Sequence, residues 1–213
     1  MYFSSNNLFY WGAANYALNK LNLDINNIPD WIIICNNDII FNKTDLIVKL
    51  QNMDSDNYAV LAPSVISIKS KKNQNPHMLY PISKLDRLYY NIFFINSVSG
   101  LFIYQIRTFL KKIFYIFSIN KTIESREIYA PHGSFMIFSK LFFNNGGWID
   151  TNFEMFAEEL TTAEIVRKLN MSILFNPDLE VIHDEHSTSG LKTWKEKFYI
   201  FKRSYYYFQQ KYL

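Results

Sequence analysis

This 213-residue chain has little cysteine, glycine or proline and few charged residues. Its single cysteine, Cys35, excludes an intrachain disulfide framework and a cysteine-based zinc ribbon, and favours a reducing compartment. With only 6 glycines and 6 prolines, the sequence is neither collagen-like nor of low complexity. Charged residues make up 19% and hydrophobic residues 49%, so the chain can form a packed core and is not intrinsically disordered.

The charge is nearly balanced, with 22 Lys and Arg against 19 Asp and Glu and a net charge of +3. This balance argues against a nucleic-acid partner. The basic residues concentrate at the carboxyl end, where residues 191–213 carry a net charge of +5 and the remaining chain carries −2. We interpret this end as a separate basic, aromatic helix.

The first residues contain neither a basic segment nor an apolar core, so we expect no signal peptide. The longest uncharged run extends from Leu88 to Ile106 and approaches the ~20 residues of a membrane-spanning helix. Polar residues interrupt this run. We therefore expect a buried or membrane-surface helix pair rather than a membrane span.

Periodicity and β-branched content predict strands that alternate with helices, which indicates an α/β fold. Trp31–Cys35 is a continuous apolar run, typical of a strand buried on both faces of a parallel sheet. Thr44 is expected to cap a helix that runs to Met53, and Pro63 favours an edge or late position in the strand at 58–66. The other expected elements are a helix at 8–20, a loop at 68–81, two helices within 82–119 that break near 97–100, strands around a kink at 128–138, a helix at 160–169, two short strands within 171–182 and a helix from 191.

Asn36 and Asp38 follow the predicted strand at 31–35, where α/β sheets bind ligands. A carboxylate at this position can hold a hard cation beside a diphosphate. A polar turn explains the same residues, because Asn and Asp favour turns.

Three further groups have both a functional and a structural interpretation. Glu158 and Glu159 open a predicted helix; one of them can serve as a general base, although acids in a first turn also complement the helix dipole. His183 begins a His-Asp-Glu-His run that could ligate a metal or form a solvated loop. Residues His132, Gly133 and Ser134 allow a close approach of backbone to a ligand, or form a β-bulge.

The order of these motifs is more specific than any one of them, and it resembles family 2 glycosyltransferases, especially their rhamnosyltransferase-like branch. The resemblance covers nearly the whole chain. It is carried by W-G-A-A-N-Y-A-L-N (11–19), I-I-I-C-N-N-D-I (32–39), A-P-H-G-S-F-M-I-F-S-K (130–140), G-G-W-I-D (146–150), F-A-E-E (156–159), N-P-D-L-E-V-I-H (176–183), S-T-S (187–189) and the tail from Arg203 to Tyr207.

The resemblance implies a GT-A fold, a Rossmann-like sheet that binds a nucleotide-sugar. It implies inverting, metal-assisted transfer of the sugar to a hydroxyl of a glycan or lipid-linked oligosaccharide during cell-surface polysaccharide synthesis. Asp38 matches the last acid of the D-x-D metal motif, and Asn36 replaces the first. Glu159 matches the catalytic base, and His183 matches a histidine associated with Mn²⁺ or Mg²⁺ and the diphosphate.

Other positions follow from the same resemblance. Glu158 lies in the cofactor-binding motif beside the base, and His132, Gly133 and Ser134 would line the donor-sugar or acceptor pocket. Trp148 and Asp150 match a Gly-Gly-Phe-Asp-like turn, in which the acid is structural or faces the acceptor.

We interpret the chain as one GT-A-like domain. Residues 1–66 would be the remnant of a nucleotide-sugar half, 67–127 a loop with a helical aromatic insertion, 128–190 the acceptor and catalytic half, and 191–213 the basic helix. The family begins with strands that hold the nucleotide base, and about 60 residues of this kind are expected to be missing, at ~30 per βαβ unit. Two hypotheses remain: an enzyme completed by a separately encoded N-terminal piece, or an inactive remnant or non-catalytic interaction module.

The resemblance places the protein in the cytoplasm, with peripheral contact at the inner membrane face as a further hypothesis. Residues 101–117 combine aromatic residues with Arg107, Lys111 and Lys112, and the tail places Tyr205–Phe208 beside Lys202 and Arg203. Basic, aromatic amphipathic helices of this kind lie on anionic membranes. A core-facing stripe with solvated lysines explains the same pattern.

Overall fold

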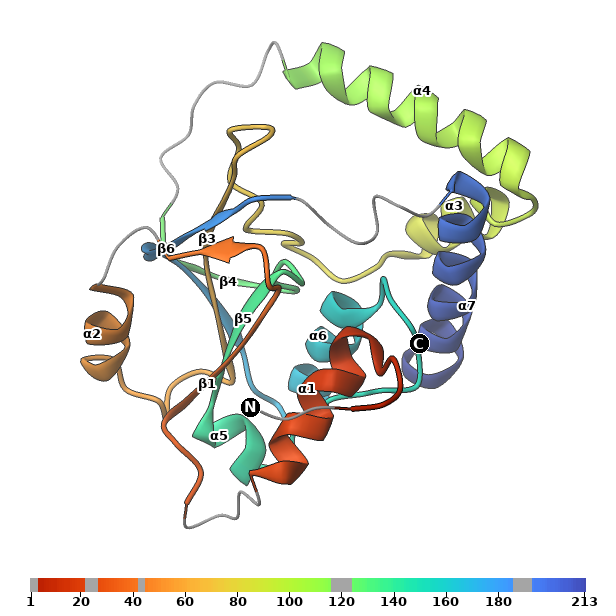
Figure 1. Cartoon of the computed structure of the whole chain (residues 1–213). Coiled ribbons are helices and arrows are strands. Elements are labelled where there is room, and N and C mark those ends of the chain that lie inside the picture. The colour runs from red at the N-terminus through yellow and green to blue at the C-terminus, as the bar shows by residue number, and fades with distance from the viewer. Residues whose placement is uncertain (1–3, 22–26, 42–44, 116–123, 186–192) are drawn as a thin grey trace.

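A computed structural model describes residues 4–21, 27–41, 45–115, 124–185 and 193–213. These residues form a six-stranded mixed sheet with helices packed around it (Figure 1), so the predicted α/β class is confirmed. The elements are α1 (Phe9–Lys20), β1 (Trp31–Cys35), β2 (Ile39–Ile40), α2 (Asp45–Gln51), β3 (Val60–Ser67), α3 (Lys84–Phe93), α4 (Ser97–Tyr115), β4 (Arg126–Ile128), β5 (Phe135–Ser139), α5 (Lys140–Asn144), α6 (Glu158–Lys168), β6 (Ile173–His183) and α7 (Trp194–Tyr212).

The sheet has the strand order β1-β5-β3-β6-β2, and β4 pairs with β6 beside this path. β3 and β6 run parallel, whereas β5 runs antiparallel to both β1 and β3. The strand predicted at Trp31–Cys35 is confirmed, but its predicted place in a parallel sheet with both faces buried is wrong. β1 lies at the end of the strand order, and Ile34 is its one fully buried residue.

The predicted edge position of Pro63 is wrong for β3 as a whole, which lies between β5 and β6, but the β3–β5 ladder ends at Leu61, so Pro63 lies beyond that pairing. The register of the β3–β6 ladder shifts between Pro63 and Ser64, so the residue that lacks an N–H sits at an irregularity. The carbonyl of Pro63 accepts a hydrogen bond from Asn75 Nδ2 at 2.8 Å. The sequence predicted two short strands within 171–182, but this segment forms the single strand β6. The polar middle of β6 lies at the register shift of the β3–β6 ladder and does not interrupt the strand.

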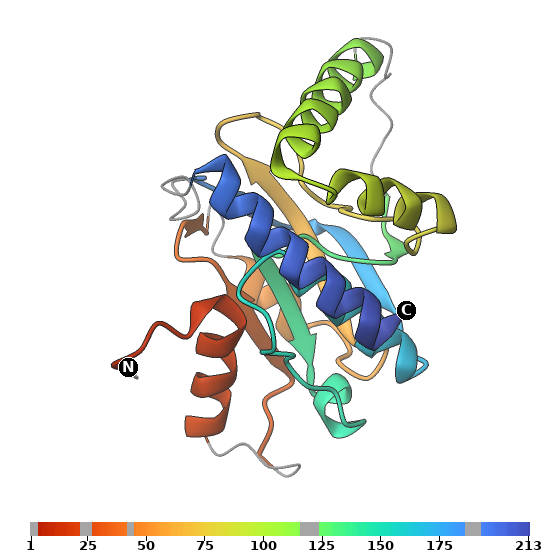
Figure 2. The same ribbon diagram turned by 90° about the vertical axis from the view of Figure 1, so that its right-hand side faces the viewer.

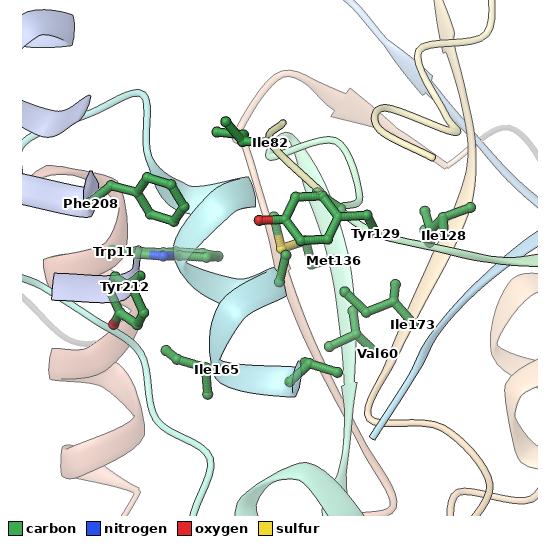
Figure 3. Packing of buried hydrophobic residues seen from close by; sticks show 14 of the residues in the cluster. Trp11, Val60, Ile82, Ile128, Tyr129, Met136, Ile165, Ile173, Phe208 and Tyr212 are labelled. Atoms are coloured by element: carbon green, nitrogen blue, oxygen red, sulfur yellow. The ribbon is translucent and has the colours of Figure 1, made fainter. Parts of the chain in front are cut away.

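The two faces of the sheet carry separate cores. On one face, side chains from α1, α6 and α7 pack on the strands, among them Trp11, Ile165, Phe208 and Tyr212 (Figure 3). Figure 2 shows α7 crossing this face diagonally. On the other face, Leu46 and Leu50 of α2 pack on the strands.

The helix pair expected within 82–119 forms as α3 and α4, but the break lies a few residues earlier than predicted. The side chain of Asn96 accepts hydrogen bonds from the backbone N–H groups of Val98 and Ser99, and thereby starts α4. Gly100 lies inside α4, where a Cβ would come within 2.5 Å of the Phe198 ring. The predicted cap Thr44 lies outside the described residues. No helix in the described ranges is long and apolar enough to cross a membrane.

The predicted carboxyl-terminal helix is confirmed as α7, which starts with a capping box between Thr193 and Glu196. Tyr205 and Phe208 are buried, so these tail aromatics belong to the core. The core-facing alternative therefore holds for them.

Candidate functional site

The predicted site residues gather where β1 and β6 end. Asn36 and Asp38 lie in the turn between β1 and β2, and Ile39 of β2 pairs with His183 at the end of β6. The backbone N–H of Asp184 donates to the Asp38 carbonyl at 2.9 Å. These contacts bring together Asp38 and His183, which are 145 positions apart in the sequence.

Asp38 and His183 face each other through buried atoms. Oδ1 of Asp38 and Nε2 of His183 lie 3.2 Å apart, with 11% and 8% of the two side chains exposed. Neither atom has a hydrogen-bond partner. Buried polar atoms of a folded protein normally have one, so an unsatisfied pair at this distance indicates a site for a ligand.

The other nitrogen of His183 is fixed by a chain of polar contacts. Nδ1 lies 2.8 Å from Gln74 Oε1, and Gln74 Nε2 donates to Glu185 Oε1 at 2.8 Å. Glu185 also accepts a hydrogen bond from Ser67 Oγ at 2.6 Å. Since the Gln74 oxygen can only accept, His183 donates from Nδ1 and, when neutral, presents the Nε2 lone pair to Asp38.

This arrangement fits a divalent cation. Metal-binding histidines usually donate their second N–H to a fixed acceptor, as His183 does to Gln74, and a carboxylate with an unsatisfied oxygen completes a pair of hard or borderline ligands. No group of three or more His, Cys, Asp or Glu side chains suited to a metal occurs within the described residues. Asp38 and His183 therefore offer two protein ligands, and a cation there would need other ligands from substrate or water.

Glu159 lies at the start of α6 against the loop that precedes β5. The backbone N–H of Gly133 donates to Glu159 Oε1 at 3.0 Å. A Cβ at position 133 would lie 2.6 Å from this oxygen, so the glycine allows the carboxylate to approach. Glu159 is partly exposed and keeps its second oxygen for another partner.

Glu158, the neighbouring acid, points into the protein. It is 7% exposed, and its Oε2 accepts a hydrogen bond from the backbone N–H of Ala157 at 2.9 Å. Burial, together with the nearby charge of Glu159, raises the pKa of Glu158 to about 8. At neutral pH Glu158 is therefore mainly protonated.

The loop that holds Gly133 also connects to the other site segments. The N–H of Asn36 donates to the Ser134 carbonyl at 2.9 Å, and the N–H of His132 donates to Asn75 Oδ1 at 2.8 Å. The His132 ring lies 6.0 Å from the His183 ring, measured between centroids. Asn36, His132, Gly133 and Ser134 thus join the site that contains Asp38, Glu159 and His183.

The protonation of His132 follows from its surroundings. Burial, aided by His77 and His183 and opposed by Glu159, lowers the pKa of His132 to about 4, so the ring is neutral at pH 7. Nδ1 accepts a hydrogen bond from the Ser134 N–H at 3.2 Å and lies 2.8 Å from Ser134 Oγ. The remaining ring proton is therefore on Nε2, which can donate to a ligand.

Tyr10 is a site residue that the motif order did not reveal. Its hydroxyl is buried without a hydrogen-bond partner. Burial raises the pKa of this phenol, and Cys35, Glu158, Glu159 and Asp38 add to the effect when they are ionised. The only available signal was the position of Tyr10 on the predicted helix at 8–20, which does not indicate where the side chain points.

The loop before α6 contains a second unpredicted feature. Phe156 has φ +73°, a left-handed conformation that is unfavourable for a bulky residue. Its ring packs 5.8 Å from that of Phe201 on α7. The core thus holds a strained backbone two residues before Glu158.

Asp150 has the structural role that was one of its two predicted alternatives. Its buried carboxylate accepts hydrogen bonds from Tyr207, Tyr212, Lys211 and Asn152. Burial opposes ionisation, but these hydrogen bonds together lower the pKa of Asp150 to about 2.

Trp148 lies apart from this cluster and is 40% exposed. It lines a groove of about 410 Å³ together with residues of α1, α5 and β1. None of the candidate catalytic, cofactor-binding or metal-binding residues lines this groove.

Neither a protein-family model nor a curated protein matches this chain. The function is therefore inferred from the motifs and from the geometry of the site.

Proposed function

We propose that this chain is a glycosyltransferase of the GT-A type, related to the rhamnosyltransferase-like branch of family 2. It would move a sugar from a nucleotide-sugar to a hydroxyl of a glycan or lipid-linked oligosaccharide, in cell-surface polysaccharide synthesis at the cytoplasmic side of the membrane. One observation carries the proposal. A single end of the sheet gathers a carboxylate held by Gly133 and a buried Asp–His pair without hydrogen bonds.

Glu159 would act as the general base. Gly133 fixes one carboxylate oxygen, and the other would take the proton from the acceptor hydroxyl as its oxygen attacks the anomeric carbon. The bond from that carbon to the diphosphate oxygen breaks in the same displacement, and its electron pair leaves with the nucleoside diphosphate. A single displacement of this kind inverts the anomeric configuration.

Asp38 and His183 would hold Mn²⁺ or Mg²⁺, which when bound neutralises charge on the leaving diphosphate. The chain Gln74–Glu185–Ser67 orients His183 for this role. His132 Nε2–H and the buried Tyr10 hydroxyl would donate hydrogen bonds to the donor. Asn36, Gly133 and Ser134 complete the proposed donor-sugar or acceptor pocket, and Glu158 stays buried beside Glu159.

A second candidate function is a non-catalytic interaction module of the same fold, and the edge of β1 favours it. Asn36 and Asp30 are hydrogen-bonded to β5, so by alternation the backbone groups of Trp31, Ile33 and Cys35 face away from β5. An apolar strand edge of this kind is a template for another strand. A strand of a partner protein would add there and either complete an enzyme or form a binding complex.

The experiment is an assay for the release of nucleoside diphosphate from a panel of nucleotide-sugars, with Mn²⁺ or Mg²⁺ and extracted glycolipid acceptors. Glu159→Gln is expected to reduce turnover by ~10²–10⁴-fold, the usual contribution of a general base. Glu127→Gln changes an exposed residue of β4 and should leave turnover intact. Absence of both donor-dependent release and nucleotide binding would exclude the enzyme and leave the interaction module.

Gly133→Ala tests the geometry of the proposed base. The added methyl group would displace the Glu159 carboxylate from the Gly133 N–H, because the two would lie 2.6 Å apart. We expect turnover to fall at least tenfold while thermal stability changes little, since the displaced group is the end of a flexible side chain. Unchanged turnover would contradict the assignment of Glu159 as the base.

A further inference from the structure

The helix pair α3–α4 has an inner face that anchors it and an outer face that is exposed. On the inner face, Phe93 and Phe94 pack against Phe198 of α7, and Trp194 donates from Nε1 to the carbonyl of Ser97 at 2.9 Å. The close approach of Gly100 to Phe198 completes this anchor. Figures 1 and 2 show α4 projecting from the rest of the molecule on this support.

The outer face is apolar along both helices. On α3, Leu85, Leu88 and Ile92 recur at the spacing of one helix face and are 78%, 56% and 47% exposed. On α4, the four residues at i, i+4, i+8 and i+11 share one face by the same periodicity. These are Val98, Phe102, Ile106 and Phe109, which are 77%, 64%, 43% and 64% exposed.

The two stripes belong to neighbouring helices. Arg107 of α4 lies over the ring of Tyr89 of α3, 5.3 Å from its centroid. Each helix thus exposes several large apolar side chains, which soluble monomers rarely do, and such surfaces mark interaction sites. We call the seven residues of the two stripes the outer face of α3–α4.

The charge of the segment indicates what covers this face. Residues 84–112 contain Lys84, Arg87, Arg107, Lys111 and Lys112 but a single acid, Asp86, giving a net charge of +4. Asp86 is engaged at the start of α3, where it accepts hydrogen bonds from the backbone and side chain of Ser83. Docking of a second copy through this face would bring two segments of +4 together, which is unfavourable. An anionic lipid surface attracts the basic residues and accepts the apolar side chains.

We propose that the outer face of α3–α4 binds the surface of membranes that contain anionic phospholipids. Leucine, isoleucine and phenylalanine side chains would enter the boundary between headgroups and acyl chains, with basic residues at the headgroups. The tail helix α7 acts as the anchor of this pair, because Tyr205 and Phe208 are buried. This inference concerns a surface separate from the Asp38–His183 and Glu159 site, and it does not depend on transferase activity.

The test is co-sedimentation of the full chain with vesicles of phosphatidylcholine, with and without phosphatidylglycerol. Binding is expected only with phosphatidylglycerol and should weaken as salt rises. The double variant Phe102→Ser and Phe109→Ser should weaken binding by tenfold or more, on the order of the loss of a buried phenylalanine. The matched control, Ile47→Ser with Val48→Ser, removes two residues of α2 that are 51% and 55% exposed and should bind like the wild type.

Two further measurements distinguish the other outcomes. Unchanged circular dichroism and melting temperature of both double variants would show that a loss of binding does not come from unfolding. Analytical ultracentrifugation without lipid would reveal a dimer, and a dimer that the phenylalanine variant abolishes would assign the face to self-association. Such a dimer would overturn the proposal. So would a wild type that does not bind phosphatidylglycerol vesicles, or equal binding by the two double variants.

Discussion

Two groups of buried acids in this chain differ in whether the protein itself satisfies them. Asp150 accepts hydrogen bonds from Tyr207, Tyr212, Lys211 and Asn152, and these connect the loop before α6 to the carboxyl end of α7. At the end of β1 and β6, Asp38 Oδ1 has no hydrogen bond and Glu158 is buried beside another acid. The first arrangement stabilises the fold, whereas the second costs stability and keeps groups available for a ligand.

The largest effect that this comparison predicts is on Asp150. Asp150→Ala would leave two tyrosine hydroxyls and the Lys211 ammonium group without their shared acceptor. We expect the free energy of unfolding to fall by about 3–5 kcal/mol, as when one partner of a buried ionic network is removed. Urea unfolding followed by circular dichroism measures this. A loss below that of an ordinary surface substitution would contradict the structural role of Asp150.

The second effect is the response of the same residue to acid. The folded-state pKa of Asp150 is about 2, below the ~3.9 of an unfolded aspartate. Its stabilisation is therefore complete above pH ~4 and is lost as the pH falls toward 2, and it amounts to roughly 2 kcal/mol. The free energies of unfolding of the wild type and Asp150→Asn should converge as the pH falls over this range. A difference between them that does not change with pH would show that another acid controls acid unfolding.

The third effect has the opposite sign and concerns Glu158. Its folded-state pKa of about 8 lies above that of an unfolded glutamate, so the folded protein holds a proton that the unfolded chain releases. Wild-type stability should fall as the pH rises from ~4.5 to ~8. Glu158→Gln removes this fall and should therefore be more stable than the wild type at pH 8, with no gain at pH 4. A gain that does not vary with pH would argue against a buried, protonated Glu158.

The smallest effect is expected for Asp38. Because Oδ1 makes no hydrogen bond, Asp38→Asn breaks none through this atom and should change the free energy of unfolding of the metal-free protein by less than ~1 kcal/mol. Chemical denaturation in the presence of a chelator provides the measurement. A loss as large as that of Asp150→Ala would place Asp38 among the structural acids.

Local sequence predicted the elements better than their places in the sheet. The β-branched run Trp31–Cys35 forms a strand as expected, but the run cannot reveal that its neighbour β5 is antiparallel. Pro63 is tolerated in β3 because the ladder with β5 ends at Leu61 and the ladder with β6 shifts register beside it. The direction of β5 and the register beside Pro63 both depend on strands more than 70 residues away, and a local sequence pattern contains no information about them.

The motif order named Asp38, Glu159 and His183, and folding brings these residues into one region. The resemblance assigned the base to Glu159, whereas the local pattern left either glutamate open, because helix geometry predicts only that adjacent residues point about 100° apart. Gln74 and Tyr10 were missed because a loop glutamine and a helical tyrosine have no distinctive sequence context. The basic, aromatic pattern that α4 and α7 share also left open which helix is buried, and packing against the sheet decides it.

The most direct test of a cation site at Asp38 and His183 is thermal unfolding of the wild type, Asp38→Asn and a matched exposed variant, Asp178→Asn, with increasing Mn²⁺ and a nucleoside diphosphate. Such a site predicts that the ligands stabilise the wild type and Asp178→Asn equally, by ~2.7 kcal/mol at a hundredfold excess over Kd. Asp38→Asn should lose most of this gain. Equal stabilisation of all three proteins, or none of the wild type, would contradict a cation site at Asp38 and His183.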